Sequence, residues 1–138
     1  MLELHNVKKT FNKGTINEKK ALQGLELTLQ SEDFVTIIGG NGAGKSTMLN
    51  MIAGVYPIDE GKIILDGTDI SRKPEYARAK YLGRVFQDPM KGTAAGMEIQ
   101  ENLALAYRRG KKRGLKWAIG KDEQGFYKEQ LKALDLGL

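Results

Sequence analysis

Nine consecutive residues of this chain form a pattern that can bind phosphate: Gly39-Gly40-Asn41-Gly42-Ala43-Gly44-Lys45-Ser46-Thr47. Glycines allow the backbone to wrap so that successive N–H groups point at phosphate oxygens, and a helix N-terminus adds positive potential. The Lys45 ammonium is placed to reach the β and γ phosphates, and the Ser46 hydroxyl to ligate Mg²⁺. A glycine-rich turn that contains Lys-Ser by chance is the alternative interpretation. The complete pattern, lying between an apolar run and a helical segment, favours a site for a nucleoside triphosphate.

Hydrophobic periodicity predicts the elements that must position this loop. Strands are expected at residues 2–11, 22–29, 34–38, 62–65 and 82–86. Residues 34–38 are apolar on both faces, which is typical of a central strand in a parallel sheet. The polar stretch 12–20 predicts a hairpin loop, and Asp66-Gly67 predicts a tight turn. The sequence therefore places the loop directly after a buried strand.

Four helices are expected. The first runs from Lys45 to Ala53, directly behind the loop, with Met48, Leu49 and Ile52 on its inner face. A short second helix begins at Pro74 and extends to about Lys80. A third is indicated by the spacing of Ile99, Leu103 and Tyr107, and a fourth by Tyr127, Leu131, Leu134 and Leu138 after Asp122-Glu123. Since composition changes near residue 90, we expect a core at residues 1–89 and a helical subdomain that begins at 90–138.

Length and composition set limits on the class of protein. The chain has 138 residues, of which 41% are hydrophobic and 28% charged, as in an ordinary globular domain. It contains no cysteine, which excludes a disulfide scaffold and thiolate metal sites. No apolar run is long enough to cross a bilayer, and the first residues do not have the pattern of a signal peptide. We therefore expect a cytoplasmic protein.

The net charge of +5 comes from one local cluster. Six of the 22 basic residues lie between positions 108 and 116, and the other 16 are balanced by 17 acidic residues. Three interpretations remain open for this cluster: a solvated connection between helices, contact with anionic lipid headgroups, or nucleic-acid binding. Nucleic acid is the least favoured, because few aromatic residues beyond Trp117 lie among the charges.

Four segments together resemble the ATP-binding subunit of ABC transporters. The loop has the form common in that family, and Leu49–Gly61 is similar to the helix exit and the strand that follows it. Val85-Phe86-Gln87-Asp88-Pro89 is similar to the family's Q-loop, and Val7–Phe11 to its first strand with an adenine-stacking aromatic residue. GTPases require an Asn-Lys-x-Asp motif for base recognition, which this sequence lacks. The resemblance covers nearly the whole chain.

The resemblance implies an α/β fold of the P-loop NTPase class, ABC ATPase type. It has a mixed sheet with N-terminal antiparallel strands and the start of a helical subdomain. The implied ligands are ATP and Mg²⁺. Lys45 and Gln87 are the expected catalytic residues, and Ser46 and Gln87 the expected metal ligands. The nucleotide contacts implied are Phe11, Gly39, Asn41, Gly42, Ala43, Gly44, Lys45, Ser46 and Thr47.

Some of these residues have structural alternatives. Phe11 could belong to the core, and an isolated Gln87 would be an ordinary solvated side chain at a strand end. The only histidine, His5, is expected to be structural. Asp66 follows a strand but is expected to be a turn residue and not a metal ligand, because Gly67 comes next.

Several motifs of the family do not occur in this sequence. These are the signature Leu-Ser-Gly-Gly-Gln, an apolar strand that ends in Asp-Glu, and a downstream histidine. A phosphate loop without a water-activating carboxylate can position a nucleotide but not activate water. The chain therefore resembles about the first half of the family's domain. We expect it to fold poorly and to bind ATP weakly when isolated.

The resemblance also implies partners. It predicts a dimer that closes on two ATP molecules, permease subunits contacted near residues 90–105, and a solute-binding protein in the assembled importer. The location would be the cytoplasmic face of the membrane, with no nucleic acid bound. The alternatives are a soluble ABC-type ATPase that acts on nucleic acid or ribosomes, and a truncated subunit that binds nucleotide without hydrolysis.

Overall fold

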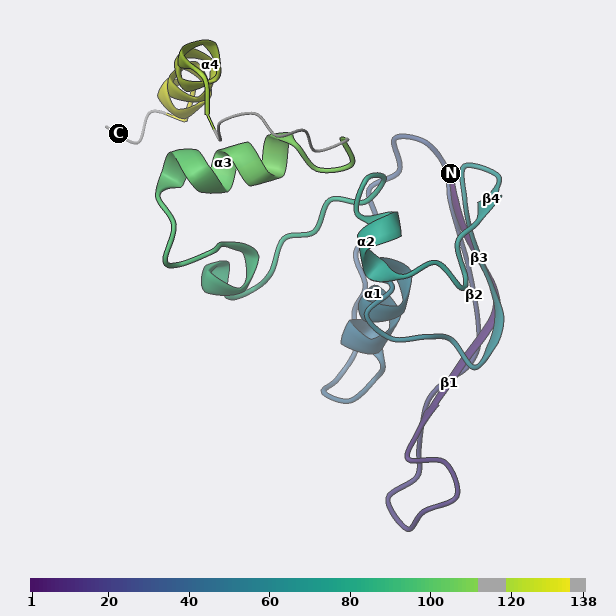
Figure 1. Ribbon diagram of the computed structural model, residues 1–138. Helices are drawn as coiled ribbons and strands as arrows, with labels where there is room; N and C mark the ends of the chain where they lie inside the picture. The colour runs from purple at the N-terminus through teal and green to yellow at the C-terminus, as the bar shows by residue number, and fades with distance from the viewer. Residues whose placement is uncertain (112–118, 135–138) are drawn as a thin grey trace. The chain divides into compact units, whose positions relative to one another are not determined.

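The computed structural model describes residues 1–111 and 119–134. They belong to two compact units, Met1–Leu82 and Gly83–Leu138. The first unit contains a β-sheet with two helices, and the second contains helices and connecting segments (Figure 1). In the described ranges, no helix is long and apolar enough to span a membrane. The α/β class predicted from the sequence is confirmed.

The sheet of the first unit has the strand order β2-β1-β3-β4, and every neighbouring pair is antiparallel. Its strands are β1 (Leu2–Phe11), β2 (Lys19–Leu29), β3 (Glu60–Leu65) and β4 (Thr68–Asp69). The long β1–β2 hairpin ends in the loop predicted at residues 12–20, although β2 already begins at Lys19 (Figure 1). The predicted turn at Asp66-Gly67 joins β3 to β4 and is confirmed.

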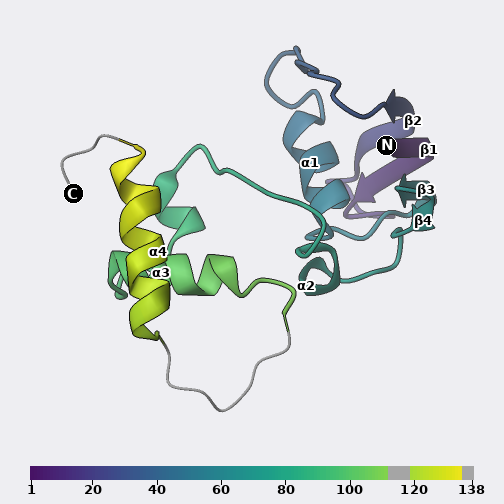
Figure 2. The same cartoon turned by 90° about the horizontal axis from the view of Figure 1, so that it is seen from above.

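A small apolar core lies between the sheet and α1 (Lys45–Ala53). Leu4, Val7 and Ile63 come from the strands, and Met48 and Met51 from the helix, all buried. Figure 2 shows α1 beside one face of the sheet. The helix has its predicted bounds, but one inner residue was predicted wrongly: Leu49 is 51% exposed and Met51 is buried instead. Residues 48, 51 and 52 therefore form the inner face, at i, i+3 and i+4.

Two predicted strands are not formed. Residues 34–38 and 82–86 are assigned to no strand, and residues 33–40 are all exposed and without regular secondary structure. A strand exists only when another backbone pairs with it. In the part of the chain that the structure describes, the segment 34–38 has no such neighbour. The described sheet is consequently antiparallel throughout, and the parallel strand that the mixed sheet would require is missing from it.

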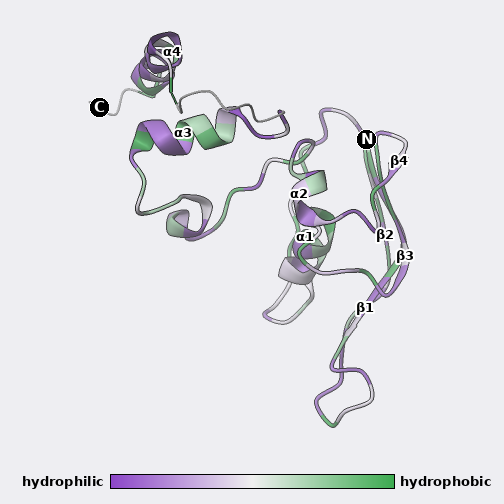
Figure 3. Ribbon diagram, in the orientation of Figure 1, coloured by the Kyte–Doolittle hydropathy of each residue, from purple (hydrophilic) through white to green (hydrophobic). Residues whose placement is uncertain are grey.

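The second unit contains a 3₁₀ turn, η1 (Pro89–Gly92), and the helices α3 (Ile99–Tyr107) and α4 (Lys121–Lys132). Both predicted helices are confirmed, but Leu134 lies beyond the end of α4, and Leu138 lies outside the described residues. An aromatic cluster of Tyr107, Phe126 and Tyr127 joins the two helices. Figure 3 shows that α4 is mostly hydrophilic along its length, which is consistent with one buried side chain on it, Tyr127.

The basic cluster falls only partly within the described residues. Arg108 donates to Glu123 at 2.6 Å, and the Lys111 ammonium lies 3.5 Å from the centroid of the Tyr107 ring. Lys112, Arg113 and Lys116 lie outside the described residues, as does Trp117. Arg108 therefore links the end of α3 to α4, whereas Lys111 contacts a residue of α3.

Candidate functional site

The predicted phosphate loop, Gly39–Gly44, leads without interruption into α1. A turn closes within it, because Ala43 N donates to Gly40 O at 3.3 Å. Met48 N then donates to Gly44 O at 2.8 Å and starts the helix. Asn41 and Ala43 lie in the exposed part of the loop, and Ser46 and Thr47 belong to the first turn of α1. All members of the predicted phosphate pattern are thus brought together at one helix N-terminus.

Gly44 shows why the loop requires glycine at this point. Its φ angle is +88°, which other residues rarely adopt. A Cβ on Gly44 would also lie 2.8 Å from Ala21 O and 2.9 Å from Leu22 Cδ2. The backbone of the loop is therefore seated directly against β2, and any side chain at this position would force the two apart.

Lys45 folds back over the loop. Its ammonium donates to Gly39 O and, at 2.8 Å, to Gly40 O. Gly44 provides no capping side chain, and the first N–H groups of a helix have no acceptor within the helix. These N–H groups, the positive end of the helix dipole and the Lys45 ammonium all favour an anion here. The arrangement can hold the phosphates of a nucleotide.

Arg78 supports the opposite end of α1, a role that sequence analysis did not predict. It lies in the short helix α2 (Glu75–Arg78) and is only 2% exposed. Its guanidinium donates to Met51 O at 2.7 Å and Ile52 O at 3.0 Å, in the last turn of α1. It also donates to the backbone carbonyls of Ser71 and Lys73. Burial lowers the pKa of Arg78 from its ordinary value, but arginine stays charged in proteins.

The sequence gives only one local signal for the role of Arg78. The available local signal is that it follows Pro74 by four residues, in the last turn of a predicted short helix. Cations are favoured there because the final carbonyls of a helix carry partial negative charge. The carbonyls that it contacts in α1 are 26 and 27 residues away along the chain. Such a long-range contact is visible only in the tertiary structure.

Phe11 ends β1 and is half-buried. The rings of Phe11 and Tyr56 meet edge to face, with centroids 5.4 Å apart and an interplanar angle of 81°. The Lys9 ammonium lies 5.5 Å from the Phe11 centroid and donates to Asp59 at 2.8 Å. This hydrogen bond holds the pKa of Asp59 below its ordinary value. The ring is held by neighbours and remains partly accessible, so adenine stacking stays a prediction.

Gln87 belongs to the second unit and is exposed at a bend just before η1. The Asp88 carboxylate next to it accepts from Met90 N at 3.0 Å and caps the 3₁₀ turn. The backbone after Gln87 is therefore fixed by a local hydrogen bond. Its predicted roles towards Mg²⁺ and water stay predictions.

The remaining polar candidates have structural contacts. His5 pairs with Glu3 at 3.0 Å and lies 3.6 Å from Glu26. Asp66 accepts from the N-terminal ammonium at 2.5 Å. Within residues 1–111 and 119–134, no three acidic, histidine or cysteine side chains are grouped so that they could hold a metal ion.

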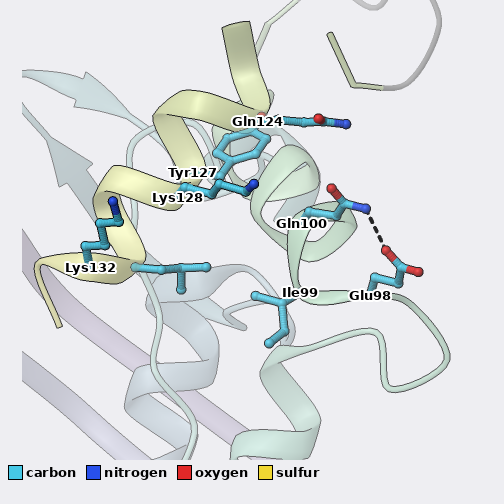
Figure 4. Close-up of a pocket in the computed structure, with 8 residues that line it drawn as sticks. Glu98, Ile99, Gln100, Gln124, Tyr127, Lys128 and Lys132 are labelled. Atoms are coloured by element: carbon cyan, nitrogen blue, oxygen red, sulfur yellow. Dashed lines mark hydrogen bonds between the residues drawn. The ribbon is translucent and has the colours of Figure 1, made fainter. Parts of the chain in front are cut away.

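A separate pocket of about 580 Å³ lies in the second unit, between α3 and α4 (Figure 4). The buried Tyr127 hydroxyl has no hydrogen-bond partner in the described residues, and the Gln100 amide donates to Glu98 at 2.6 Å. None of the predicted nucleotide contacts lines this pocket. Its lining consists of Glu98, Ile99, Gln100, Gln124, Tyr127, Lys128, Leu131 and Lys132.

Comparisons with known proteins relate the chain to a described family. Residues 22–136 match the family described as "ABC transporter". The chain is 41% identical over 116 residues to the "Tyrosine transport ATP-binding protein" of Clostridioides difficile, a match that covers 84% of this chain and 46% of that protein. It is 37% identical to the "Spermidine/putrescine import ATP-binding protein PotA" of Haemophilus influenzae, which covers 78% of this chain and 27% of that protein.

Solved structures show the same similarity. The dimeric ATP-binding cassette MJ0796 bound to ADP and Pi matches with a TM-score of 0.78 and 30% identity, over 99% of this chain and 58% of that one. The cassette MJ1267 matches with a TM-score of 0.73 and 30% identity, over 99% of this chain and 55% of that one. The chain thus spans between 27% and 58% of the length of these four proteins.

Proposed function

Because this chain belongs to the ABC transporter family, we propose that it is the ATP-binding region of the ATPase subunit of a bacterial importer. The observation that carries the proposal is the loop Gly39–Gly44, with its positive-φ glycines and the Lys45 ammonium, at the N-terminus of α1. The relatives named for tyrosine transport and for spermidine/putrescine import support the importer class.

In this proposal the loop binds the phosphates of ATP. Backbone N–H groups from Gly39 to Thr47 surround the phosphate oxygens, and Lys45 exchanges its carbonyl partners for the β and γ phosphates. Phe11 stacks on adenine, because its ring is half-buried and held in place by Tyr56. Hydrolysis takes place in the full-length dimer, in which the signature sequence of one subunit faces the loop of the other.

Mg²⁺ fits this site as an ion held mainly by the nucleotide. The described residues lack a cluster of carboxylates, and Mg²⁺ usually keeps several waters and is bound through few protein ligands plus substrate phosphates. The Ser46 hydroxyl and the Gln87 amide oxygen are the ligands that we propose. When bound, the ion neutralises charge on the phosphates.

The proposed partners follow from the same assignment. Residues 1–89 form the ATP-binding core, and residues 90–138 begin the helical subdomain. Permease subunits contact the segment near residues 90–105, and a solute-binding protein delivers the solute. Glu98, Ile99 and Gln100, which line the pocket of the second unit, fall within that segment. The protein is then located at the cytoplasmic face of the membrane.

Titration of the full-length protein with Mg-ATP tests the proposal. We expect saturable binding that Lys45→Ala weakens at least tenfold (about 1.4 kcal/mol or more), because a charge-assisted contact to phosphate is lost. Lys62→Ala, at an exposed lysine of β3, is the matched control and should bind as the wild type does. Equal affinities of the Lys45→Ala and wild-type proteins would contradict the proposed site.

A further inference from the structure

Lys19 lies between two parts of the proposed nucleotide site, the strand end that carries Phe11 and the phosphate loop. It is the first residue of β2 and pairs across the hairpin with Phe11, the last residue of β1. Its ammonium lies 3.6 Å from the position that a Cβ on Gly42 would occupy. One side chain thus extends from the strand pair that carries the proposed adenine platform to the phosphate loop.

The start of β2 follows the loop for several residues. Lys19 lies against Gly42, and Ala21 and Leu22 lie against Gly44. All of these residues belong to the first unit. The side chain of Lys19 is therefore the cationic part of a strand segment that is already seated on the loop backbone.

The charge of Lys19 is available to a ligand. Lys45 donates to two loop carbonyls, and the neighbouring Lys8 and Lys9 are paired with Glu60 and Asp59 at 2.6 and 2.8 Å. Lys19 is exposed, and in the described parts of the chain its ammonium has neither an ion pair nor a hydrogen bond to a side chain. An unpaired cation beside an anion-binding loop attracts a polyanion.

We propose that Lys19 is a second phosphate-binding cation of this site, which contacts the di- or triphosphate of the nucleotide from β2. The inference rests on the proposed function, since it requires a nucleotide in the loop. The inference also goes beyond the proposed function, because the phosphate-loop pattern includes no residue of β2. The consequence is selectivity: Lys19 favours ATP and ADP over AMP and adenosine, which have fewer charges to offer.

The test compares Lys19→Gln with Lys20→Gln in the full-length protein. Lys20 is the next residue on the same strand, so its side chain points to the opposite face, and both substitutions remove one charge. We expect Lys19→Gln to lower the affinity for Mg-ATP and for Mg-ADP about tenfold, and to change the affinity for adenosine less than twofold. Lys20→Gln should match the wild type, and Lys19→Arg should restore most of the affinity.

Different outcomes separate this inference from the proposed function. If the wild type binds no ATP, or Lys45→Ala binds as well as the wild type, the proposed function is wrong. If Lys45→Ala loses affinity while Lys19→Gln and Lys20→Gln are alike, the inference about Lys19 alone is wrong. Equal weakening of ATP and adenosine by Lys19→Gln would also overturn it, because a merely structural role does not distinguish phosphates.

Discussion

Arg78 places a buried guanidinium against four backbone carbonyls, two of which belong to the last turn of α1. Ile52 O has no donor within the helix, and Met51 O also accepts from Gly54 N at 3.1 Å. Gly54 allows the approach, because a Cβ there would lie 2.9 Å from Arg78 Nε. The helix that carries the phosphate loop at one end is thus anchored at the other end by one side chain.

Replacing Arg78 should therefore destabilise the first unit. Arg78→Met keeps most of the aliphatic volume but leaves buried carbonyls without donors, and we expect the free energy of unfolding to fall by about 3 kcal/mol. Urea unfolding measures the change. Arg72→Met, at an exposed arginine in the same segment, should change stability by less than about 0.5 kcal/mol. If both variants unfolded alike, the anchoring role of Arg78 would be wrong.

At the scale of elements, the phosphate loop depends on its contact with β2. The loop has few bonds of its own, and its backbone is positioned where Gly44 meets Ala21 and Leu22. Ala21 lies close to the start of the strand, beside Lys19. The strand therefore supports the loop next to the N-terminus of α1, and its Lys19 places a cation beside the loop.

Gly44→Ala tests this contact. A methyl group there would clash with Ala21 O, so we expect the loop to move and the affinity for Mg-ATP to fall at least tenfold. Gly14→Ala is the matched control: Gly14 also has a positive φ, +78°, but nothing lies within 4 Å of its Cβ position. That variant should lose about 1 kcal/mol of stability from backbone strain and keep its affinity. Isothermal titration with both variants decides between the outcomes.

At the scale of the whole molecule, one apolar segment is left uncovered in the described residues. Phe34 is 94% exposed and Ile38 is 91% exposed. Val35 and Ile37, between them, are also exposed. An exposed segment with apolar side chains and unpaired backbone N–H and C=O groups is a template for pairing with another chain. The 138-residue chain therefore carries a surface that favours self-association.

We expect the isolated 138-residue chain to bind a hydrophobic dye and to associate in a concentration-dependent manner. The double substitution Phe34→Ser and Ile38→Ser should lower both signals at least severalfold, because it removes two exposed apolar side chains. Tyr76→Ser, at a position that is also exposed, serves as the control. Dye fluorescence and sedimentation velocity are the measurements. A monomeric wild-type chain with a cooperative thermal transition and micromolar affinity for Mg-ATP would contradict this expectation.

Features that depend on residues close together along the chain were predictable from the sequence. The bounds of α1 follow from the glycines before it, its apolar spacing and Gly54 after it. The Asp66-Gly67 turn and the helix at Ile99–Tyr107 likewise depend on local backbone chemistry. The strand at residues 34–38 was predicted wrongly, because an apolar run shows that a strand is possible but not that another backbone pairs with it.

The sequence by itself determined the family and the phosphate-loop pattern, because both consist of residue types at short, fixed spacings. Only the tertiary structure decided which distant groups support that loop. Arg78 reaches carbonyls of α1 that are 26 and 27 residues away, and Lys19 lies beside Gly42 across the space between β2 and the loop. Such contacts depend on how the chain returns on itself. The physical reason is that side chains act over a few ångströms in space, whatever their separation along the chain.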